Sequence, residues 1–197
     1  MTSTSIAALL LAAGSSTRLG TPKQLLKYRG QSLLRHIAEI VLASSVGEMH
    51  VVVGFEAEQM KAELHGLDAR LVDNANWHKG MASSIRTGIS ALQQSIDAVV
   101  ILLCDQPLIT TQLLDGIISA HATTGKPIVA CEYGGTVGAP ALFARSCFPE
   151  LLQLEGDRGA KQLITQHLDQ VAVVLFPGGS VDIDTAADYE RLRSSEK

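Results

Sequence analysis

The sequence has few aromatic residues, few cysteines and no long hydrophobic run. Aromatic residues make up 4% of its 197 residues, and Cys104, Cys131 and Cys147 are far apart, with no CxxC pair. This cysteine content argues against a disulfide framework and against a zinc site. The longest apolar runs, Ile6–Ala13 and Ala98–Cys104, are well short of the ~20 residues that a membrane-spanning helix needs.

An excess of positive charge is also lacking. Sixteen Lys and Arg stand against twenty Asp and Glu, which gives a net charge of −4. With no basic block to offset this balance, we expect no nucleic-acid partner. The N-terminal residues Met1–Ser5 lack the basic region of a signal peptide, and no membrane segment is expected. The length is typical of one domain, so residues 1–197 are expected to form a single soluble, cytoplasmic domain.

What the sequence does contain is a regular alternation of two kinds of segment. Several short runs are apolar at nearly every position, which is typical of strands covered on both faces. The expected strands are Ile6–Leu11, Met49–Val53, Arg70–Val72, Ala98–Leu103, Pro127–Ala130 and Val171–Phe176. Apolar stripes at helical spacing begin at Leu33, Ile85 and Leu113 between them. This alternation predicts an α/β sandwich with a mostly parallel sheet.

One region, Glu132–Ala144, interrupts the alternation. Its glycines and Pro140 predict a turn-rich excursion that could be a hairpin. In α/β folds ligands bind in a crevice beyond the carboxyl ends of the strands. The polar residues just after each strand are therefore the first candidates for a site.

The strongest candidate follows the first strand, over residues Leu11–Lys23. Gly14 and Gly20 permit tight turns and a close approach of the backbone to a ligand. Consecutive backbone N–H groups in such a loop form a nest for anions, and Arg18 and Lys23 add positive charge suited to a polyphosphate. The spacing fits neither the GxxxxGK[ST] loop nor the GxGxxG fingerprint. An ordinary glycine-rich turn with surface cations stays open as the alternative.

Two acidic positions are candidate metal ligands. Asp105 follows the strand Ala98–Leu103, and a carboxylate beside a phosphate loop suits Mg²⁺. Asp184 would supply a second carboxylate, and Asp182 faces the same way on an extended chain. Capping of a turn or of the last helix is the alternative role for both positions. Cys104 is expected to be a buried apolar residue rather than a nucleophile.

Two further segments lead into helices with polar side chains. Residues 73–84 are dense in side-chain donors, and Ser83 and Ser84 are expected to cap a helix whose N-terminus would favour a polar ligand. Trp77, the only Trp, is expected mainly as core filler. Residues 156–161 open a helix with two cations that could grip a phosphate, or form an ordinary Asp-capped helix.

Together and in this order, the segments resemble the MobA-like nucleotidyltransferase family, and within it the molybdenum cofactor cytidylyltransferase branch. That branch has an LAAGxSxRMGxxKQLL loop, matched by Leu11–Leu26 with Leu19 for Met, and a CDQP motif identical to Cys104–Pro107. Its NPxWxxGMxSS, GxPxLF, GDxGAR and DIDTPEDY motifs are similar to Asn74–Ser84, Gly138–Phe143, Gly156–Lys161 and Asp182–Tyr189. The departures are Ala75 for Pro, Lys161 for Arg, and Ala186 and Ala187 for Pro and Glu.

The resemblance implies a Rossmann-like three-layer α/β/α fold and a Mg²⁺-dependent transfer of CMP from CTP to molybdopterin that carries molybdenum. A molybdoenzyme or its chaperone would then be a partner. Guanylyl-transferring relatives have a Gly-Gly pair where this chain has Ala13-Gly14, so the loop favours CTP. Three alternatives remain: a nucleotidyltransferase with another nucleotide or acceptor, an oxidoreductase on the same fold, and a non-catalytic cofactor-binding protein.

The resemblance also suggests roles for single residues. Arg18, Lys23 and Asp105 are the expected catalytic residues, with Asp105 and Asp184 as metal ligands. The expected nucleotide-binding residues are Leu11, Ala12, Ala13, Gly14, Arg18, Lys23, Asp73, Asn74, Ser84 and Asp105. The expected acceptor-binding residues are Gly138, Ala139, Pro140, Gly156, Asp157, Gly159 and Lys161. Because a phosphate acceptor is already ionised at neutral pH, catalysis is expected from positioning and charge neutralisation rather than from a strong base.

Overall fold

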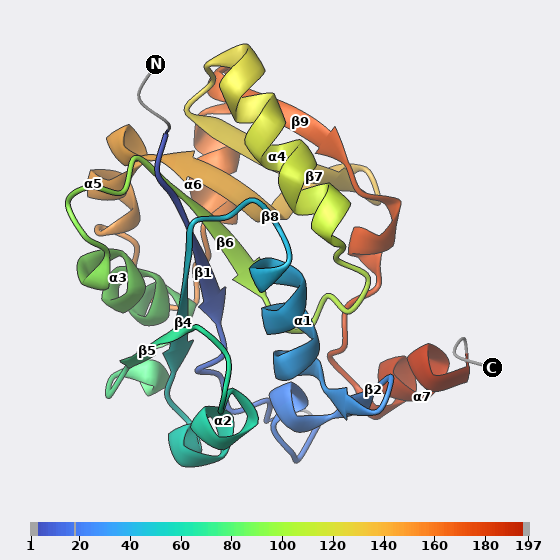
Figure 1. The fold of residues 1–197 in the computed structure, drawn as a ribbon. Helices are drawn as coiled ribbons and strands as arrows, with labels where there is room; N and C mark the ends of the chain where they lie inside the picture. The colour runs from blue at the N-terminus through green and yellow to red at the C-terminus, as the bar shows by residue number, and fades with distance from the viewer. Residues whose placement is uncertain (1–3, 18, 195–197) are drawn as a thin grey trace.

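The computed structural model describes residues 4–17 and 19–194 (Figure 1). Over these residues, seven strands form one sheet in the order β5-β4-β1-β6-β8-β7-β9. They are β1 (Ile6–Leu11), β4 (Glu48–Val53), β5 (Arg70–Asp73), β6 (Ala98–Leu103), β7 (Ile128–Tyr133), β8 (Thr136–Ala144) and β9 (Val171–Leu175). The pairings β1–β4, β1–β6, β4–β5 and β7–β9 are parallel. The prediction of a mostly parallel sheet is confirmed.

The interruption after β7 is a hairpin whose return strand enters the sheet. Gly134 and Gly135 have φ of 55° and 74°, a backbone conformation that glycine adopts without strain. The return strand, β8, is antiparallel to both β6 and β7 and lies between them. Leu142 and Phe143 on it are fully buried. The segment that looked turn-rich in the sequence is thus mostly a core strand.

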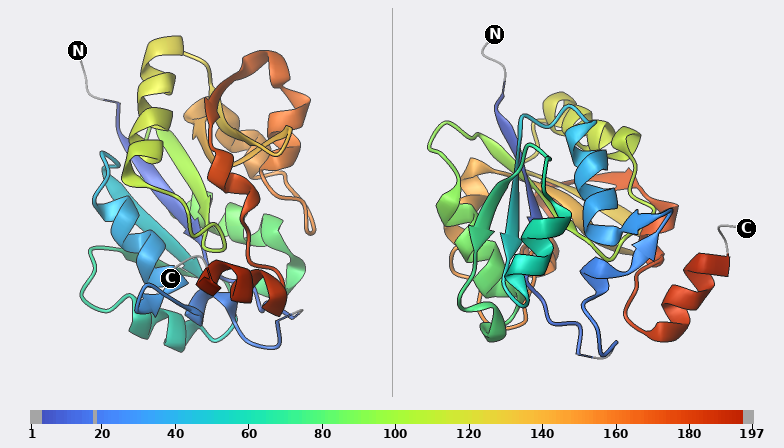
Figure 2. Two further views of the ribbon diagram at one scale, coloured as in Figure 1. Left: turned by 90° about the vertical axis from the view of Figure 1, so that its right-hand side faces the viewer. Right: turned by 60° about the horizontal axis from the view of Figure 1, so that its bottom comes forward.

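Helices cover both faces of the sheet and make the fold a three-layer sandwich (Figures 1 and 2). One face is covered by α1 (Leu33–Leu42), α2 (Ala57–Glu63) and α4 (Thr111–Thr124). The other face is covered by α3 (Met81–Ala91), α5 (Phe148–Leu151) and α6 (Lys161–Gln166). The Rossmann-like α/β/α arrangement is therefore confirmed.

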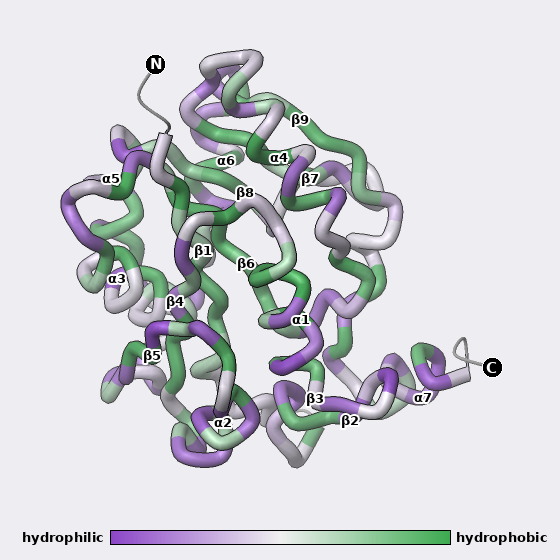
Figure 3. The backbone as a smooth tube through the Cα atoms, in the orientation of Figure 1, coloured by the Kyte–Doolittle hydropathy of each residue, from purple (hydrophilic) through white to green (hydrophobic). Residues whose placement is uncertain are grey.

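The central strands divide the core because their side chains point alternately to the two faces. On β1, Ala8 and Leu10 pack with α1, whereas Leu9 and Leu11 pack with α3. Figure 3 shows these strands as a hydrophobic centre of the molecule. Burial of one large aliphatic side chain is worth roughly 1.5–3 kcal/mol, so this double-sided burial is what holds the sheet in place.

The last helix, α7 (Ala186–Ser194), lies outside these layers, beside the small β2–β3 sheet (Figures 2 and 3). That sheet pairs β2 (Lys27–Tyr28) with β3 (Gln31–Ser32). A separate apolar cluster joins the two parts through Tyr28, Leu33, Ile183 and Leu192. The helix is therefore attached to the loop region that follows β1 rather than to the main core.

A capping box begins α7. The Thr185 hydroxyl accepts a hydrogen bond from the Asp188 N–H at 3.3 Å, and the Asp188 carboxylate accepts one from the Thr185 N–H at 2.7 Å. Such a reciprocal pair satisfies two backbone donors at a helix start. Thr185, not Asp184, is thus the capping residue, and the Asp184 side chain turns elsewhere.

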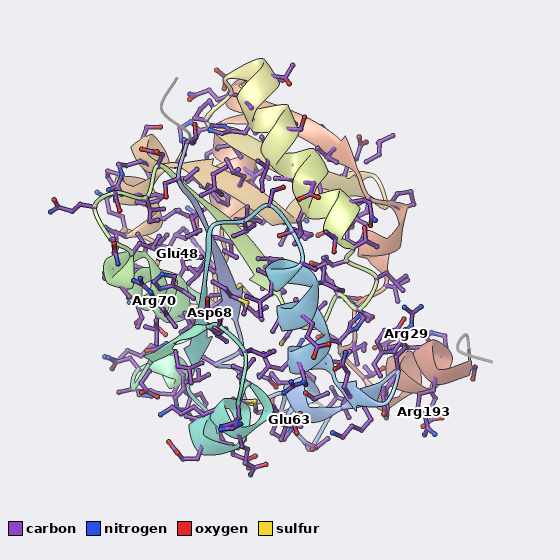
Figure 4. The ribbon with its side chains drawn as sticks, in the orientation of Figure 1. Arg29, Glu48, Glu63, Asp68, Arg70 and Arg193 are labelled. Atoms are coloured by element: carbon purple, nitrogen blue, oxygen red, sulfur yellow. The ribbon has the colours of Figure 1, made fainter. Side chains whose placement is uncertain are left out.

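Charged side chains lie at the periphery of this packing (Figure 4). Glu48 and Arg70 form an ion pair of 3.2 Å across β4 and β5, at the end of the sheet opposite to the carboxyl ends of these strands. Arg29 and Arg193 each lie over a tyrosine ring, at 5.1 and 5.8 Å from the ring centre. Over residues 4–17 and 19–194, no helix is long and apolar enough to cross a membrane.

Candidate active site

A cavity of about 470 Å³ opens at the carboxyl ends of β1 and β6. This volume is in the usual range for small-molecule sites. The cavity is lined by Leu11, Ala13, Gly14, Ser15, Ser16, Thr17, Leu19, Lys23, Gln24, Trp77, His78, Gly80, Met81, Ser84, Leu103, Cys104, Asp105, Asp157 and Asp184. The structure therefore brings the loop after β1, the segment before α3 and the two acidic positions to one place.

The loop after β1 is held by a buried side chain from the short helix η1 (Lys23–Leu25). The Gln24 amide nitrogen donates to the carbonyl oxygens of Ala12 at 3.0 Å and of Gly14 at 2.8 Å. The Ser16 hydroxyl accepts a hydrogen bond from the Lys23 N–H at 3.0 Å. The loop is thus tied to η1 in one shape, as a preformed anion nest requires. Arg18, expected in this loop, lies outside the described residues.

Among the side chains that line the cavity, one ammonium group bridges two carboxylates. Lys23 Nζ hydrogen-bonds Asp105 Oδ2 and lies 3.2 Å from Asp184 Oδ1. The three side chains are 20%, 15% and 35% exposed, so they interact in a largely desolvated place. Charge-assisted hydrogen bonds in such surroundings are stronger than those between neutral groups.

The same arrangement sets the protonation of Lys23. Burial by itself would lower the pKa of the Lys23 ammonium, but attraction by Asp105, the hydrogen bond that Lys23 donates to the Asp105 carboxylate and the charge of Asp184 outweigh that effect. The pKa of Lys23 is therefore raised above its usual value of 10.5. Lys23 stays positively charged throughout the physiological range.

A main-chain contact brings Asp184 to this point. The Ile183 N–H donates to the Asp105 carbonyl at 3.1 Å, which ties the chain before α7 to the end of β6. The Ile183 side chain is fully buried in the cluster with Tyr28 and Leu33. Two carboxylates from distant parts of the sequence are thereby held side by side.

These carboxylates fit a divalent cation of the Mg²⁺ type. The Asp105 Oδ1 atom is buried and has no hydrogen-bond partner among the described residues, an arrangement that normally costs free energy. Mg²⁺ is typically held by one or two carboxylates, water and substrate phosphates. No group of three or more Asp, Glu, His or Cys residues able to hold a metal occurs over residues 4–17 and 19–194. Asp105 and Asp184 are two cavity carboxylates that could hold such an ion.

The segment before α3 contributes to the cavity in part. Asn74 is buried and does not line the cavity, and its amide donates to the hydroxyls of Ser83 at 2.9 Å and Ser84 at 3.1 Å. Ser84 itself lines the cavity. Asp73, expected among the nucleotide ligands, lies outside the cavity and pairs with Lys61 at 2.9 Å.

The expectation that Ser83 and Ser84 cap α3 is wrong. The helix begins at Met81, with Gly80 at the N-cap position and φ of 91°. The Ser83 hydroxyl instead lies 2.9 Å from the carbonyl oxygens of Asn76 and Gly80, which share its single donor hydrogen. Gly80 is required there because a side chain would collide with Gly156, whose carbonyl oxygen would be 2.4 Å from a Cβ atom.

The residues expected around the acceptor fall into two groups. Asp157 lines the cavity, and its neighbours Gly156 and Gly159 pack against the start of α3, where the Gly156 carbonyl accepts a hydrogen bond from the Ala82 N–H at 3.1 Å. Lys161 begins α6 and is exposed.

Gly138, Ala139 and Pro140 belong to β8 and are not among the residues that line the cavity. The Ala139 carbonyl accepts a hydrogen bond from the buried Gln106 side chain at 3.0 Å. The loop after β6 is thus linked to the hairpin next to the cavity.

Sequence comparison places this site in a known family. The profile of the MobA-like NTP transferase domain matches residues 8–171, which include the first loop and Asp105. The chain belongs to the MobA-like NTP transferase family. It is accordingly a nucleotidyltransferase by family, as the motifs suggested.

This MobA-like transferase is similar over nearly its full length to two curated proteins and to one solved structure. Purine catabolism protein PucB of Bacillus subtilis is 28% identical over 198 residues, which cover 94% of each chain. Nicotine blue oxidoreductase of Paenarthrobacter nicotinovorans is 33% identical over 198 residues, covering 95% of this chain and 96% of that protein. The structure of Rv0371c from Mycobacterium tuberculosis, solved in complex with manganese, has a TM-score of 0.79 and 30% identity over 96% of this chain and 98% of that one.

Several side chains in the transferase's cavity were not singled out in the sequence. These are Gln24, His78 and Met81. Trp77, expected mainly as core filler, packs against the core and also lines the cavity. The KQLL motif contained Gln24, but nothing in the sequence showed that its amide would hold the loop. Trp77 packs edge-on against Phe55, with ring centres 5.3 Å apart.

Cys104 also lines the cavity of this MobA-like transferase, but its thiol is protonated. Burial and the Asp105 charge raise its pKa to about 12. Because the thiolate is the nucleophilic form, a role for Cys104 as a nucleophile is not supported.

Proposed function

We propose that this MobA-like transferase moves CMP from CTP to the terminal phosphate of molybdenum-carrying molybdopterin and releases pyrophosphate. A new bond forms between an acceptor phosphate oxygen and the α-phosphorus, and the bond from that phosphorus to the pyrophosphate oxygen breaks. The acceptor oxygen is already ionised, so no proton has to be removed first. The observation that carries the proposal is the Lys23 ammonium bridging Asp105 and Asp184 in the lining of the cavity.

Each part of the cavity has a task in this proposal. The loop held by Gln24, together with Lys23, binds the β- and γ-phosphates and stabilises the departing pyrophosphate. The main chain of Leu11–Ala13 and Ser84, whose hydroxyl is held by Asn74, surround base and ribose. When Mg²⁺ is bound by Asp105 and Asp184, it supplies neutralisation of phosphate charge. The proposed nucleotide specificity rests on Ala13-Gly14 in the first loop.

The proposed acceptor subsite lies around Asp157, at the rim of the cavity. Gly159 allows this loop to lie against the start of α3, because a Cβ atom there would be 2.7 Å from the Met81 sulfur. Lys161 and the Gly138–Pro140 segment would complete it where a longer acceptor extends beyond the cavity. A molybdoenzyme or its chaperone would receive the product.

The experiment that tests this function is pyrophosphate release with each of CTP, GTP, ATP and UTP, in the presence of Mg²⁺ and molybdopterin carrying molybdenum. The expected result is release with CTP that depends on the acceptor. Release with GTP alone would contradict the proposed nucleotide. No release with any nucleotide, despite tight binding of the cofactor, would indicate a binding protein instead.

A second candidate comes from one relative. The similar protein from Paenarthrobacter nicotinovorans is called an oxidoreductase, and the similarity covers nearly the full length of this chain. The matched test is binding of NADH and NADPH, measured beside binding of CTP. Binding of a reduced nicotinamide cofactor without binding of CTP would favour this candidate over nucleotidyl transfer.

A further inference from the structure

The Lys23 ammonium occupies the point on which the two carboxylates converge. Its Nζ atom contacts Asp105 Oδ2 and is 3.2 Å from Asp184 Oδ1. An ion bound to the unpartnered Asp105 Oδ1 and to Asp184 would sit on the same two carboxylate groups as the Lys23 ammonium, and therefore close to it. Two cations a few ångströms apart in a partly desolvated site repel each other strongly. Lys23 and a divalent metal therefore exclude each other unless the Lys23 side chain moves.

The site has a place for Lys23 to move to. The first loop, which Gln24 ties to η1, lines the same cavity as Lys23. A triphosphate in this cavity would present several negatively charged oxygens to the Lys23 side chain. The ammonium would then exchange carboxylate partners for phosphate partners, and its positive charge would leave the two carboxylates at the moment when a metal is needed.

We propose that Lys23 acts as an internal counter-ion that blocks the metal site until a nucleoside triphosphate draws it away. This inference rests on the proposed nucleotide binding. It adds that metal and triphosphate bind cooperatively, and that the protein without nucleotide binds metal weakly. By linkage the effect is reciprocal, so the metal must raise the affinity for the triphosphate by the same factor. Couplings of this kind are typically about 5–150-fold.

The first test uses the metal alone. Mn²⁺ is a suitable probe, because its free form is measured by electron paramagnetic resonance and because the similar protein Rv0371c was solved with manganese. Without any nucleotide, Lys23→Met is expected to bind Mn²⁺ at least about fivefold more tightly than the wild type. Adding Asp105→Asn to Lys23→Met should abolish the gain. Equal affinity of wild type and Lys23→Met, or a gain that survives Asp105→Asn, would overturn the proposal.

The chain offers a matched control in Lys61. Its ammonium also bridges two carboxylates, Glu58 at 3.0 Å and Asp73 at 2.9 Å, but outside the cavity. Lys61→Met makes the same change of charge and is expected to leave Mn²⁺ affinity as in the wild type. A similar gain in Lys61→Met would show a general charge effect and contradict competition at the site.

A second measurement needs no variant and covers the case in which Lys23→Met does not fold. The fluorescence of Trp77, the only Trp, reports on the cavity that it lines, and bound Mn²⁺ should quench it. The wild type is titrated with Mn²⁺ alone and with an α,β-methylene analogue of CTP present. Quenching at least about fivefold more sensitive to Mn²⁺ with the analogue supports the proposal, and unchanged sensitivity overturns it.

These results separate the inference from the proposed function. The comparison of Lys23→Met with the wild type involves no nucleotide, no acceptor and no turnover. If cytidylyl transfer is observed but Lys23→Met binds Mn²⁺ no better, only the competition is wrong. If Lys23→Met binds Mn²⁺ more tightly but no nucleotide is turned over, the proposed function is wrong and the competition for the carboxylates stands.

Discussion

The side-chain amide of Gln24 donates a hydrogen bond to the main-chain carbonyl of Gly14 at 2.8 Å, across ten positions of sequence. The same nitrogen reaches the Ala12 carbonyl at 3.0 Å, and the side chain is 2% exposed. One buried amide thus sets the shape of the loop that borders the cavity. Gln24 does not itself have to contact a nucleotide to affect its binding.

Replacement of Gln24 by Ala is expected to weaken nucleotide binding. Two carbonyl groups would lose a buried donor, each at a cost of about 0.5–1.5 kcal/mol, and the loop would sample other shapes. We expect an affinity for CTP about tenfold lower, which corresponds to about 1.4 kcal/mol. Isothermal titration calorimetry with Mg²⁺-CTP measures this affinity. In turnover assays of Gln24→Ala, KM should rise by a larger factor than kcat falls. Gln112→Ala, at an exposed position on α4, is the control, and equal affinities of the two variants would contradict the assignment.

Asp184→Asn is expected to reduce kcat by about 10²–10³-fold, the usual cost of losing one charged contact in a transition state. The matched control is Asp182→Asn, two residues away and exposed, which should keep kcat within about twofold because Asp182 does not line the cavity. Pyrophosphate release with CTP is the measurement. Similar losses in both variants would show that overall charge, not the position of Asp184, is what matters.

Asp182 should also make stability depend on pH. Partial desolvation of its carboxyl group and the charges of Asp184 and Asp105 raise its pKa above the usual 3.8, so its proton is bound more tightly in the folded state. Protonation therefore stabilises the fold, and this contribution is lost as pH rises through the folded-state pKa. Asp182→Asn is expected to raise Tm at pH 7, with a gain that shrinks as pH falls toward 3.8. A gain independent of pH would rule out this electrostatic cause.

Two helical glycines should respond in opposite directions to Ala. A Cβ atom at Gly88 on α3 would lie 2.4 Å from a terminal carbon of Leu9, which is fully buried on β1. Gly88→Ala is expected to destabilise the fold by about 1–3 kcal/mol through overpacking. At Gly116 on α4 nothing lies within 4 Å, so Gly116→Ala should stabilise by up to about 1 kcal/mol through helix propensity. Urea unfolding measures the change in the free energy of unfolding for both variants. A change of the same sign in both would contradict the packing described.

The three cysteines are expected to be unreactive in the folded protein. All are buried, and burial raises the pKa of Cys104 and of Cys131 to about 12. At pH 8 almost no thiolate is present, so a disulfide reagent such as DTNB should titrate three thiols only after unfolding in urea. Rapid reaction of one thiol in the native protein, lost in Cys104→Ala, would reopen a chemical role for that residue.

Much of the fold could be predicted because its cause is local. Strand Ala98–Leu103 has the predicted bounds. A short run that is apolar at every position suits a strand covered by helices on both faces of the sheet, and the polar residues after it mark its end. The excursion after β7 was less predictable, because the insertion of β8 between β6 and β7 depends on pairing with strands distant in sequence. The prediction that Ser83 and Ser84 cap α3 failed because the helix begins earlier, at Met81 after Gly80, which places both serines inside its first turn.

The sequence by itself determined the alternation of strands and helices, the glycine-containing loop after β1 and the acidic residues that follow the strands, since each depends on neighbours along the chain. Only the tertiary structure decided that Lys23, Asp105 and Asp184 meet at one point. Their meeting depends on the Ile183–Asp105 main-chain bond and on the apolar cluster that holds the chain before α7 against β2 and β3. Such contacts join residues up to 161 positions apart, and no local pattern encodes them.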